Sequence, residues 1–273
     1  MLAIEKVFRY LVQVLFCLLP GVAWSAADAG APVDRSVNYL VVDEKTVPFQ
    51  IVEDGESKGG IVSDIVTAIF QGTGYQVTAR VLPVNRLRLV VAENKVHHWI
   101  AFDSPAWNSF GDKGDMLPQP LFTTSHIMLT CNPEAPGQID SVDDLKGLSI
   151  VTLKYFNYLS LSQAEEQGVI RSIPVDRYDV GLKLVSLGRA DGFIEMKTRL
   201  DFHLDNFAGD HGCFREVDVS HVIPDYDVHL SIDPGWPEDF KEMVNNRLEA
   251  LHRSGELNRI INRYAPDEVP DLP

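Results

Sequence analysis

The sequence is short of positive charge and has few long apolar runs. Of its 273 residues, 24 are Lys or Arg and 39 are Asp or Glu, which gives a net charge of −15. Nucleic acids and anionic membrane surfaces would repel so acidic a chain. We therefore expect neither as a partner, although the charge by itself does not identify a ligand.

Sequence signatures of catalytic and metal sites are also missing. There is no Gly-x-Ser-x-Gly motif, and Gly72–Gly74 ends a predicted helix instead of following a strand, so it does not form a phosphate-binding loop. The eight histidines lack the paired spacing of zinc ligands, and in the second half His211 and Cys213 are the one close pair. We expect no metal and no cofactor.

The one strongly apolar run, Leu11–Leu19, follows two basic residues near the amino terminus. It is too short to cross a bilayer core of roughly 30 Å, and small residues surround Ala26. We predict a signal peptide over residues 1–26, a polar linker over 27–35 and export to the periplasm. Loss of the leader removes two basic side chains and one acidic side chain, so the mature charge is −16.

Two cysteines, Cys131 and Cys213, remain after the leader. An oxidising compartment allows them to form one disulfide, and two separate buried thiols are the alternative. The sequence leaves this choice open.

Apolar periodicity predicts an alternation of strands and helices. The expected strands span residues 37–42, 75–82, 99–102, 149–153, 169–175, 191–196 and 214–219. The expected helices span 61–70, 87–92, 155–168 and 178–188, with a helical tail over 237–264. An amphipathic stretch covers 197–207. Strands separated by single helices imply right-handed crossovers and a mainly parallel sheet.

Two extended runs, 121–131 and 227–232, bracket the second alternating unit. We predict a first lobe formed by residues 36–122 and 228–273. A second lobe, 123–227, is inserted between two crossing strands. A cleft between the lobes follows from this layout.

The segment Ala101–Phe110 (AFDSPAWNSF) places a corner at the end of the third predicted strand. Open α/β sheets bind ligands beyond the carboxyl ends of their strands. We predict that Asp103, Ser104 and Trp107 contact a ligand there. The alternative is an ordinary surface turn, because Asp, Ser and Pro are common turn residues.

Several short motifs follow one another in order along the chain. They are Pro48-Phe49, Gly59–Ile65 (GGIVSDI), Leu121–Thr124 (LFTT), Asp143–Gly147 (DDLKG), Gly188–Gly192 (GRADG) and Ser254–Ile260 (SGELNRI). In this order they resemble solute-binding proteins of family 3, the amino-acid-type receptors of ABC transporters. The resemblance implies a type II periplasmic binding protein fold: α/β, two lobes, each a mainly parallel sheet flanked by helices, and two crossing hinge strands.

The corner departs from that family's pattern. Its members usually carry there an arginine that binds the ligand's carboxylate as a bidentate pair, whereas this chain has Trp107. An indole can stack on a ring or a cation but does not neutralise an anion. Arg86, near the start of a predicted helix, could replace the missing arginine, or it could be an exposed helix-start residue.

The resemblance implies further site residues. Glu195 is the acid nearest to the one that meets the ligand's amino group, although it falls one residue early and strand alternation could turn it away. Phe49 corresponds to an aromatic lid, or it packs under a loop. Tyr155 and Asn157 stand at a helix start whose backbone amides could hold an anion, and Tyr155 could instead be buried.

We therefore predict a monomeric periplasmic protein that is not an enzyme. It would bind a small polar solute, amino-acid-like or an amine or aromatic compound, and deliver it to an inner-membrane ABC permease. Two alternatives stay open on the same fold. One is a cyclohexadienyl-dehydratase-like enzyme in which Glu195 supplies a proton, and the other is a stand-alone sensory ligand-binding protein.

Overall fold

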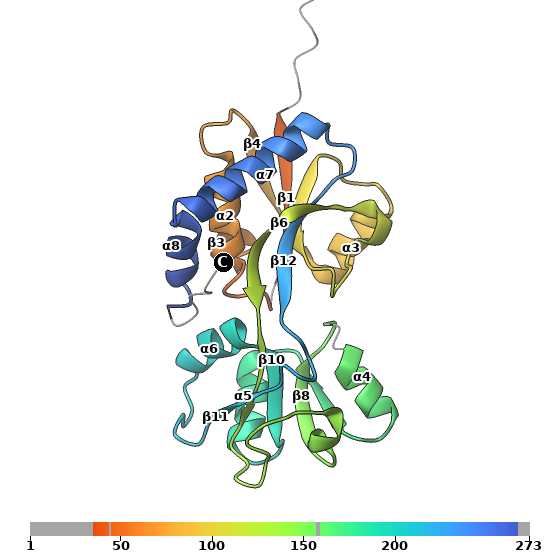
Figure 1. Cartoon of the computed structure of the whole chain (residues 1–273), viewed down its shortest axis with the longest axis vertical. Helices are drawn as coiled ribbons and strands as arrows, with labels where there is room; N and C mark the ends of the chain where they lie inside the picture. Colours follow the sequence, from red (N-terminus) through yellow and green to blue (C-terminus); the bar gives the residue numbers. More distant parts are fainter. Residues whose placement is uncertain (1–34, 44, 157–158, 267–273) are drawn as a thin grey trace, which may run out of the picture. The chain divides into compact units, whose positions relative to one another are not determined.

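The computed structural model describes residues 35–43, 45–156 and 159–266 (Figure 1). The predicted signal peptide, most of the predicted linker and Asn157 lie outside these residues.

Five strands form the first sheet, in the order β4-β1-β5-β12-β6. They are β1 (Ser36–Asp43), β4 (Gln76–Pro83), β5 (Trp99–Asp103), β6 (Asp115–Thr124) and β12 (Tyr226–Ile232). Only β12 runs against the other four strands, because it pairs antiparallel with both β5 and β6. The sheet is therefore mainly parallel, as predicted.

Helices cover both faces of this sheet. They are α2 (Ile61–Phe70), α3 (Val84–Ala92), α7 (Glu238–Arg253) and α8 (Glu256–Asn262). Tyr39 and Val41 pack in one core with α2, α7 and α8, whereas Leu40 packs with α3 in another. Successive side chains of a strand point to opposite faces, so β1 contributes to both cores. Figure 1 shows α3 on one side of the sheet and α2, α7 and α8 on the other.

The second sheet has the order β11-β7-β10-β8-β9. Its strands are β7 (His126–Thr130), β8 (Ser149–Leu153), β9 (Arg171–Val175), β10 (Gly192–Met196) and β11 (Arg215–Asp218). Only β7 runs against the other four. One face packs against α4 (Leu159–Glu166), and the opposite face packs against α5 (Tyr178–Ser186) and α6 (Lys197–Asp205).

The chain passes between the sheets twice. It enters the second sheet between Thr124 and His126, and it returns to the first between Asp218 and Tyr226. This is the inserted second unit that the two extended runs predict. The exact lobe limits, 122/123 and 227/228, stay a prediction.

Two features depart from the predicted elements. A hairpin of β2 (Ile51–Glu53) and β3 (Glu56–Gly59) lies in a segment where no strand is predicted, and an Asp-Gly turn joins its strands. Asp54 and Gly55 both have positive φ, 52° and 75°, as tight hairpin turns require. The predicted helical tail divides into α7 and α8 because Gly255 adopts a left-handed conformation, φ 70°, that ends a helix.

Two short 3-10 helices, η1 (Gly111–Lys113) and η2 (Val142–Leu145), complete the elements, and Ser141 and Asp144 form a capping box at η2. Cys131 and Cys213 are joined by a disulfide, with their Cα atoms 4.9 Å apart. In the part of the chain that the structure describes, no helix has the length and apolar character needed to span a bilayer.

Candidate functional site

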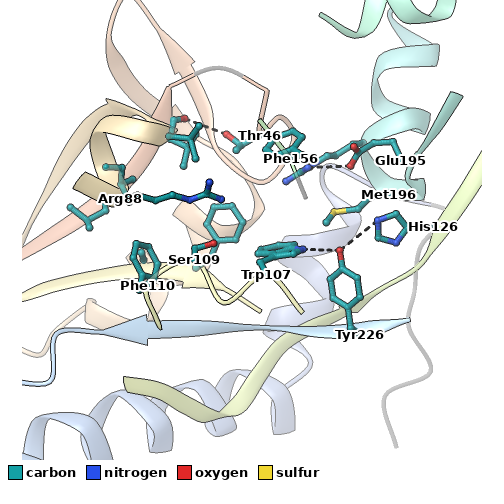
Figure 2. A pocket seen from close by; sticks show the side chains of 17 residues that line it. Thr46, Arg88, Trp107, Ser109, Phe110, His126, Phe156, Glu195, Met196 and Tyr226 are labelled. Atoms are coloured by element: carbon teal, nitrogen blue, oxygen red, sulfur yellow. Dashed lines mark hydrogen bonds and ion pairs between the residues drawn. The ribbon is translucent and has the colours of Figure 1, made fainter. Parts of the chain in front are cut away.

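A cavity lies where both lobes contribute side chains (Figure 2). Phe102, at the end of β5, and Tyr226, at the start of β12, come from the first sheet, while His126 and Glu195 come from the second. The space open to the centre of a water molecule is about 80 Å³. This cavity is a candidate site for a small molecule.

The Asp-Ser-Pro corner follows β5 directly, at the carboxyl end of that strand, as predicted. Ser104 is fully buried and donates a hydrogen bond to the carbonyl oxygen of Asp227 at 2.7 Å. Asp103, also buried, accepts one from the Ser109 amide at 2.9 Å. Burial raises the pKa of the Asp103 carboxyl. Neither Asp103 nor Ser104 lines the cavity, and their hydrogen bonds build the turn that presents Trp107.

Trp107 begins a polar chain that links the lobes. Its indole Nε1 donates to the Tyr226 hydroxyl at 2.8 Å, and that hydroxyl lies 3.5 Å from Nε2 of His126 (Figure 2). Burial raises the pKa of Tyr226 to about 12 and lowers the pKa of His126 to about 4. Both side chains are therefore uncharged near neutral pH, and they can offer hydrogen bonds without adding charge to the cavity.

Glu195 lines the cavity together with Met196, which follows it at the end of β10. Its carboxylate is paired with Arg199, in the first turn of α6, at 3.1 Å. The guanidinium of Arg199 also lies 4.9 Å from the ring centre of Phe156. Arg199 was missed in the sequence, although its spacing of four residues from Glu195 at a helix start is typical of an ion pair.

Phe49, the predicted lid, does not line the cavity. Its side chain is 0% exposed and packs against the Phe122 ring, with 5.1 Å between centroids. The Arg199 guanidinium lies 4.9 Å from its ring centre, so Phe49 meets the second lobe through this cation-π contact.

Arg86 is exposed and lies outside the cavity, whereas Arg88 lines it. Positions two residues apart on a helix point about 200° apart, so the side of α3 that carries Arg88 is not the side that carries Arg86. Val84, Leu87 and Val91 mark the apolar side of α3, and Arg88 stands on that side at the i+4 position from Val84. This spacing was the signal that could have identified Arg88.

Tyr155 is 61% exposed and lies outside this cavity. Its ring lies 5.0 Å from Nζ of Lys45. The next residue, Phe156, lines the cavity instead. Asn157 lies outside the described residues. Of the predicted site residues, the structure thus brings together Trp107 and Glu195 in the cavity wall.

The wall combines aromatic rings with few charges. Phe102, Trp107, Phe110 and Phe156 contribute aromatic rings, and Arg88 adds a guanidinium. Within the described ranges, no group of three or more His, Cys, Asp or Glu side chains is placed to hold a metal ion. The arrangement suits noncovalent binding of a small molecule that has an apolar body and a polar group.

No protein-family model matches the chain, and no curated protein matches its sequence. Solved structures do match its fold. The probable amino-acid ABC transporter extracellular-binding protein ytmK from Bacillus subtilis has a TM-score of 0.66 and 15% identity, covering 86% of this chain and 99% of its own. The periplasmic VFT2 domain of Bordetella pertussis BvgS has a TM-score of 0.65 and 17% identity, covering 85% and 94%.

A third match is the ancestral amino acid-binding protein AncCDT-1, a precursor of cyclohexadienyl dehydratase. Its TM-score is 0.63 at 16% identity, over 85% of this chain and 95% of its own. At sequence identities of 15–17%, these structural similarities establish the fold alone. The type II periplasmic binding protein fold predicted from the sequence motifs is confirmed.

Proposed function

We propose that this protein binds a small organic solute in the cavity between its two sheets and delivers it to an ABC-type permease. The observation that supports this most directly is the composition of the cavity wall, to which both lobes contribute side chains. A solute that touches both lobes binds more tightly when the lobes face each other than when they are apart. This difference in affinity shifts the equilibrium between the two arrangements toward the one in which the lobes face each other.

Contacts between the lobes at the cavity edge fit this mechanism. Arg199 of the second lobe lies over Phe49 of the first, and Tyr226 of the first lies beside His126 of the second. We propose that hinge motion occurs where the chain passes between the sheets, at 124–126 and 218–226. Bound solute would add contacts to those that the two lobes already make.

Transport in the periplasm by a monomer is the form of this function that we favour. The similarity to an amino-acid ABC transporter binding protein supports it. The similarity to a BvgS periplasmic domain supports a sensory role as the second candidate, with the same solute-binding step. Co-purification with a permease or with a sensor protein separates the two.

A ligand screen tests solute binding itself. Thermal shift over amino acids, amines, small peptides and aromatic acids should give a ligand-dependent rise in melting temperature. Trp107→Ala should weaken binding of the responding compound, because the indole forms part of the cavity wall. Tyr155→Ala is the control and should bind normally, since Tyr155 lies outside the cavity. Equal affinity in Trp107→Ala and the wild type would refute this site.

The same screen tests the enzyme alternative, for which the similarity to a dehydratase precursor is the support. Each compound that raises the melting temperature is incubated with the protein and followed by mass spectrometry. Loss of water or carbon dioxide from the compound would replace the transport proposal by an enzymatic one. Unchanged compound supports binding alone.

A further inference from the structure

We propose that Arg88 anchors a carboxylate in this cavity, and that the solute is a small organic acid with an apolar or aromatic body and no ammonium group. This inference rests on the proposed function, because it specifies the class of solute bound at the same site.

The backbone of Arg88 is held firmly by the packing of α3. Leu87 and Val91 are 2% and 3% exposed and pack against Leu40 and Ala101 of the first sheet. Figure 2 shows the Arg88 side chain extending into the cavity, toward the space between Thr46, Ser109 and Trp107. A helix packed into a core positions a binding group more precisely than a loop does.

The polar atoms of Arg88 suit an anion. Its Nε is buried and has no hydrogen-bond partner among the residues that the structure describes. A buried donor that is left without an acceptor destabilises the protein, whereas a solute oxygen would satisfy it. The guanidinium is planar and always charged, and it can bind both oxygens of a carboxylate at once.

Among the residues that the structure describes, no acidic side chain is paired with Arg88 in the cavity wall. Of the acidic side chains in the described part of the chain, only Glu195 lines the cavity, and its carboxylate is paired with Arg199 at 3.1 Å. His126 is uncharged near neutral pH because burial lowers its pKa to about 4. The described lining residues therefore carry one positive charge in excess, and a single negative charge on the solute would balance it.

The pairing of Glu195 also bears on amino acids. Moving an ammonium group from water into a protein cavity costs free energy, and a neighbouring carboxylate offsets this cost. Glu195 already binds Arg199, and Asp103 lies outside the cavity. An amino acid would bring an ammonium group to a cavity whose described lining residues offer it no available acidic partner. A plain carboxylate avoids this cost, and the rings of Phe102, Phe110 and Phe156 would contact its apolar body.

The experiment compares compounds of similar shape and different charge. Benzoate, phenylacetate and 3-phenylpropionate are the carboxylates, their amides are the neutral probes, and phenethylamine and phenylalanine carry the ammonium group. Binding to the full mature chain is measured by calorimetry and thermal shift at pH 7.5. At least one carboxylate should bind, and its amide should bind on the order of 10- to 100-fold more weakly, the effect of losing a charge-assisted hydrogen bond.

Variants then assign the effect to Arg88. Arg88→Gln should weaken carboxylate binding by a similar factor and leave amide binding unchanged, which also shows that the variant is folded. Arg88→Lys should bind the carboxylate with intermediate affinity because it keeps the charge without the planar fork. Arg86→Gln is the matched control on the same helix and should bind as the wild type does.

Three results would overturn the inference. If a carboxylate binds Arg88→Gln as tightly as the wild type, Arg88 is not the anchor, although solute binding stands. If the amides, phenethylamine or phenylalanine bind better than the carboxylates, the solute class is wrong and solute binding again stands. If none of these compounds binds, the inference fails, and the broader screen then decides whether the proposed function fails with it.

Discussion

Glu195 and Arg199 form an ion pair in which both side chains are almost fully buried, with Oε1 of the carboxylate 3.1 Å from Nη1 of the guanidinium. The pair is created by the junction of β10 and α6, which sets the two residues one helical turn apart. Arg199 also lies between the rings of Phe49 and Phe156, so the pair connects the core of the first lobe with the cavity wall. Neither charge reaches bulk water.

Removing one partner of this pair should strongly destabilise the protein. Glu195→Gln leaves the Arg199 charge buried without its carboxylate, and we expect a loss of about 3 kcal/mol in the free energy of unfolding. Urea denaturation measures it. Glu249→Gln is the matched control, because Glu249 and Arg253 form a pair of the same i,i+4 spacing at the surface. That change should cost about 0.5 kcal/mol or less. Equal losses in the two variants would contradict this assignment.

The disulfide between Cys131 and Cys213 should stabilise the second lobe. It closes a loop between residues 82 apart in sequence, and such a cross-link restricts the unfolded chain. We expect Cys131→Ser combined with Cys213→Ser to lower the free energy of unfolding by about 2–4 kcal/mol. A reductant should lower the melting temperature of the wild type to that of the variant and leave the variant unchanged. A wild type insensitive to reductant would show that the bond is not formed.

Acid should weaken the fold through His126. Burial lowers its pKa from 6.5 to about 4, so in that window the unfolded chain binds more protons than the folded protein. Stability should therefore fall as the pH drops from about 6.5 to about 4, by up to about 3 kcal/mol, and His126 should contribute no pH dependence above this window. Burial lowers the pKa of His203 in the same way, to about 4, and adds to the effect.

Urea denaturation at pH 7.5 and pH 5 measures this dependence. His126→Gln should show a smaller difference in unfolding free energy between the two pH values than the wild type does. His97→Gln, which changes an exposed histidine of the first lobe, should keep the full difference. The assignment is wrong if His126→Gln retains the wild-type pH dependence.

Gly60 should not tolerate a side chain. It precedes α2 with φ 107°, and a Cβ there would lie 2.7 Å from the carbonyl oxygen of Phe49 and 2.8 Å from that of Pro48. We expect Gly60→Ala to cost about 3 kcal/mol or more in unfolding free energy, from strain and backbone contact together. Gly72→Ala is the control for positive φ alone, because a Cβ at Gly72 would meet open space. This variant should lose about 1 kcal/mol of unfolding free energy. Similar melting temperatures for the two variants would refute the steric argument.

Local patterns in the sequence were sufficient for most elements. Apolar spacing located α2 at the predicted limits, 61–70. The β2–β3 hairpin escaped because its strands are short and polar, although Asp54 and Gly55 carried a turn signal. The division of the tail at Gly255 escaped because glycine is tolerated inside helices as well as at their ends.

The candidate site was harder to predict because it depends on side-chain direction. Trp107 and Glu195 were expected in the cleft, and both line the cavity. Arg86 was chosen over Arg88 from its place at the start of a helix, and only the packing of α3 shows which of the two faces the sheet. Asp103 and Ser104 stand at the expected corner, but their hydrogen bonds fix the turn instead of reaching a ligand.

The sequence by itself determined the alternation of strands and helices, the inserted second lobe and the position of the corner at the end of β5, because these follow from periodicity and turn chemistry within short stretches of chain. The tertiary structure alone decided that Arg199 holds Glu195 and that Arg88 enters the cavity. Both outcomes depend on which faces of separate elements meet, and that is fixed by the packing of whole lobes, which no short segment specifies.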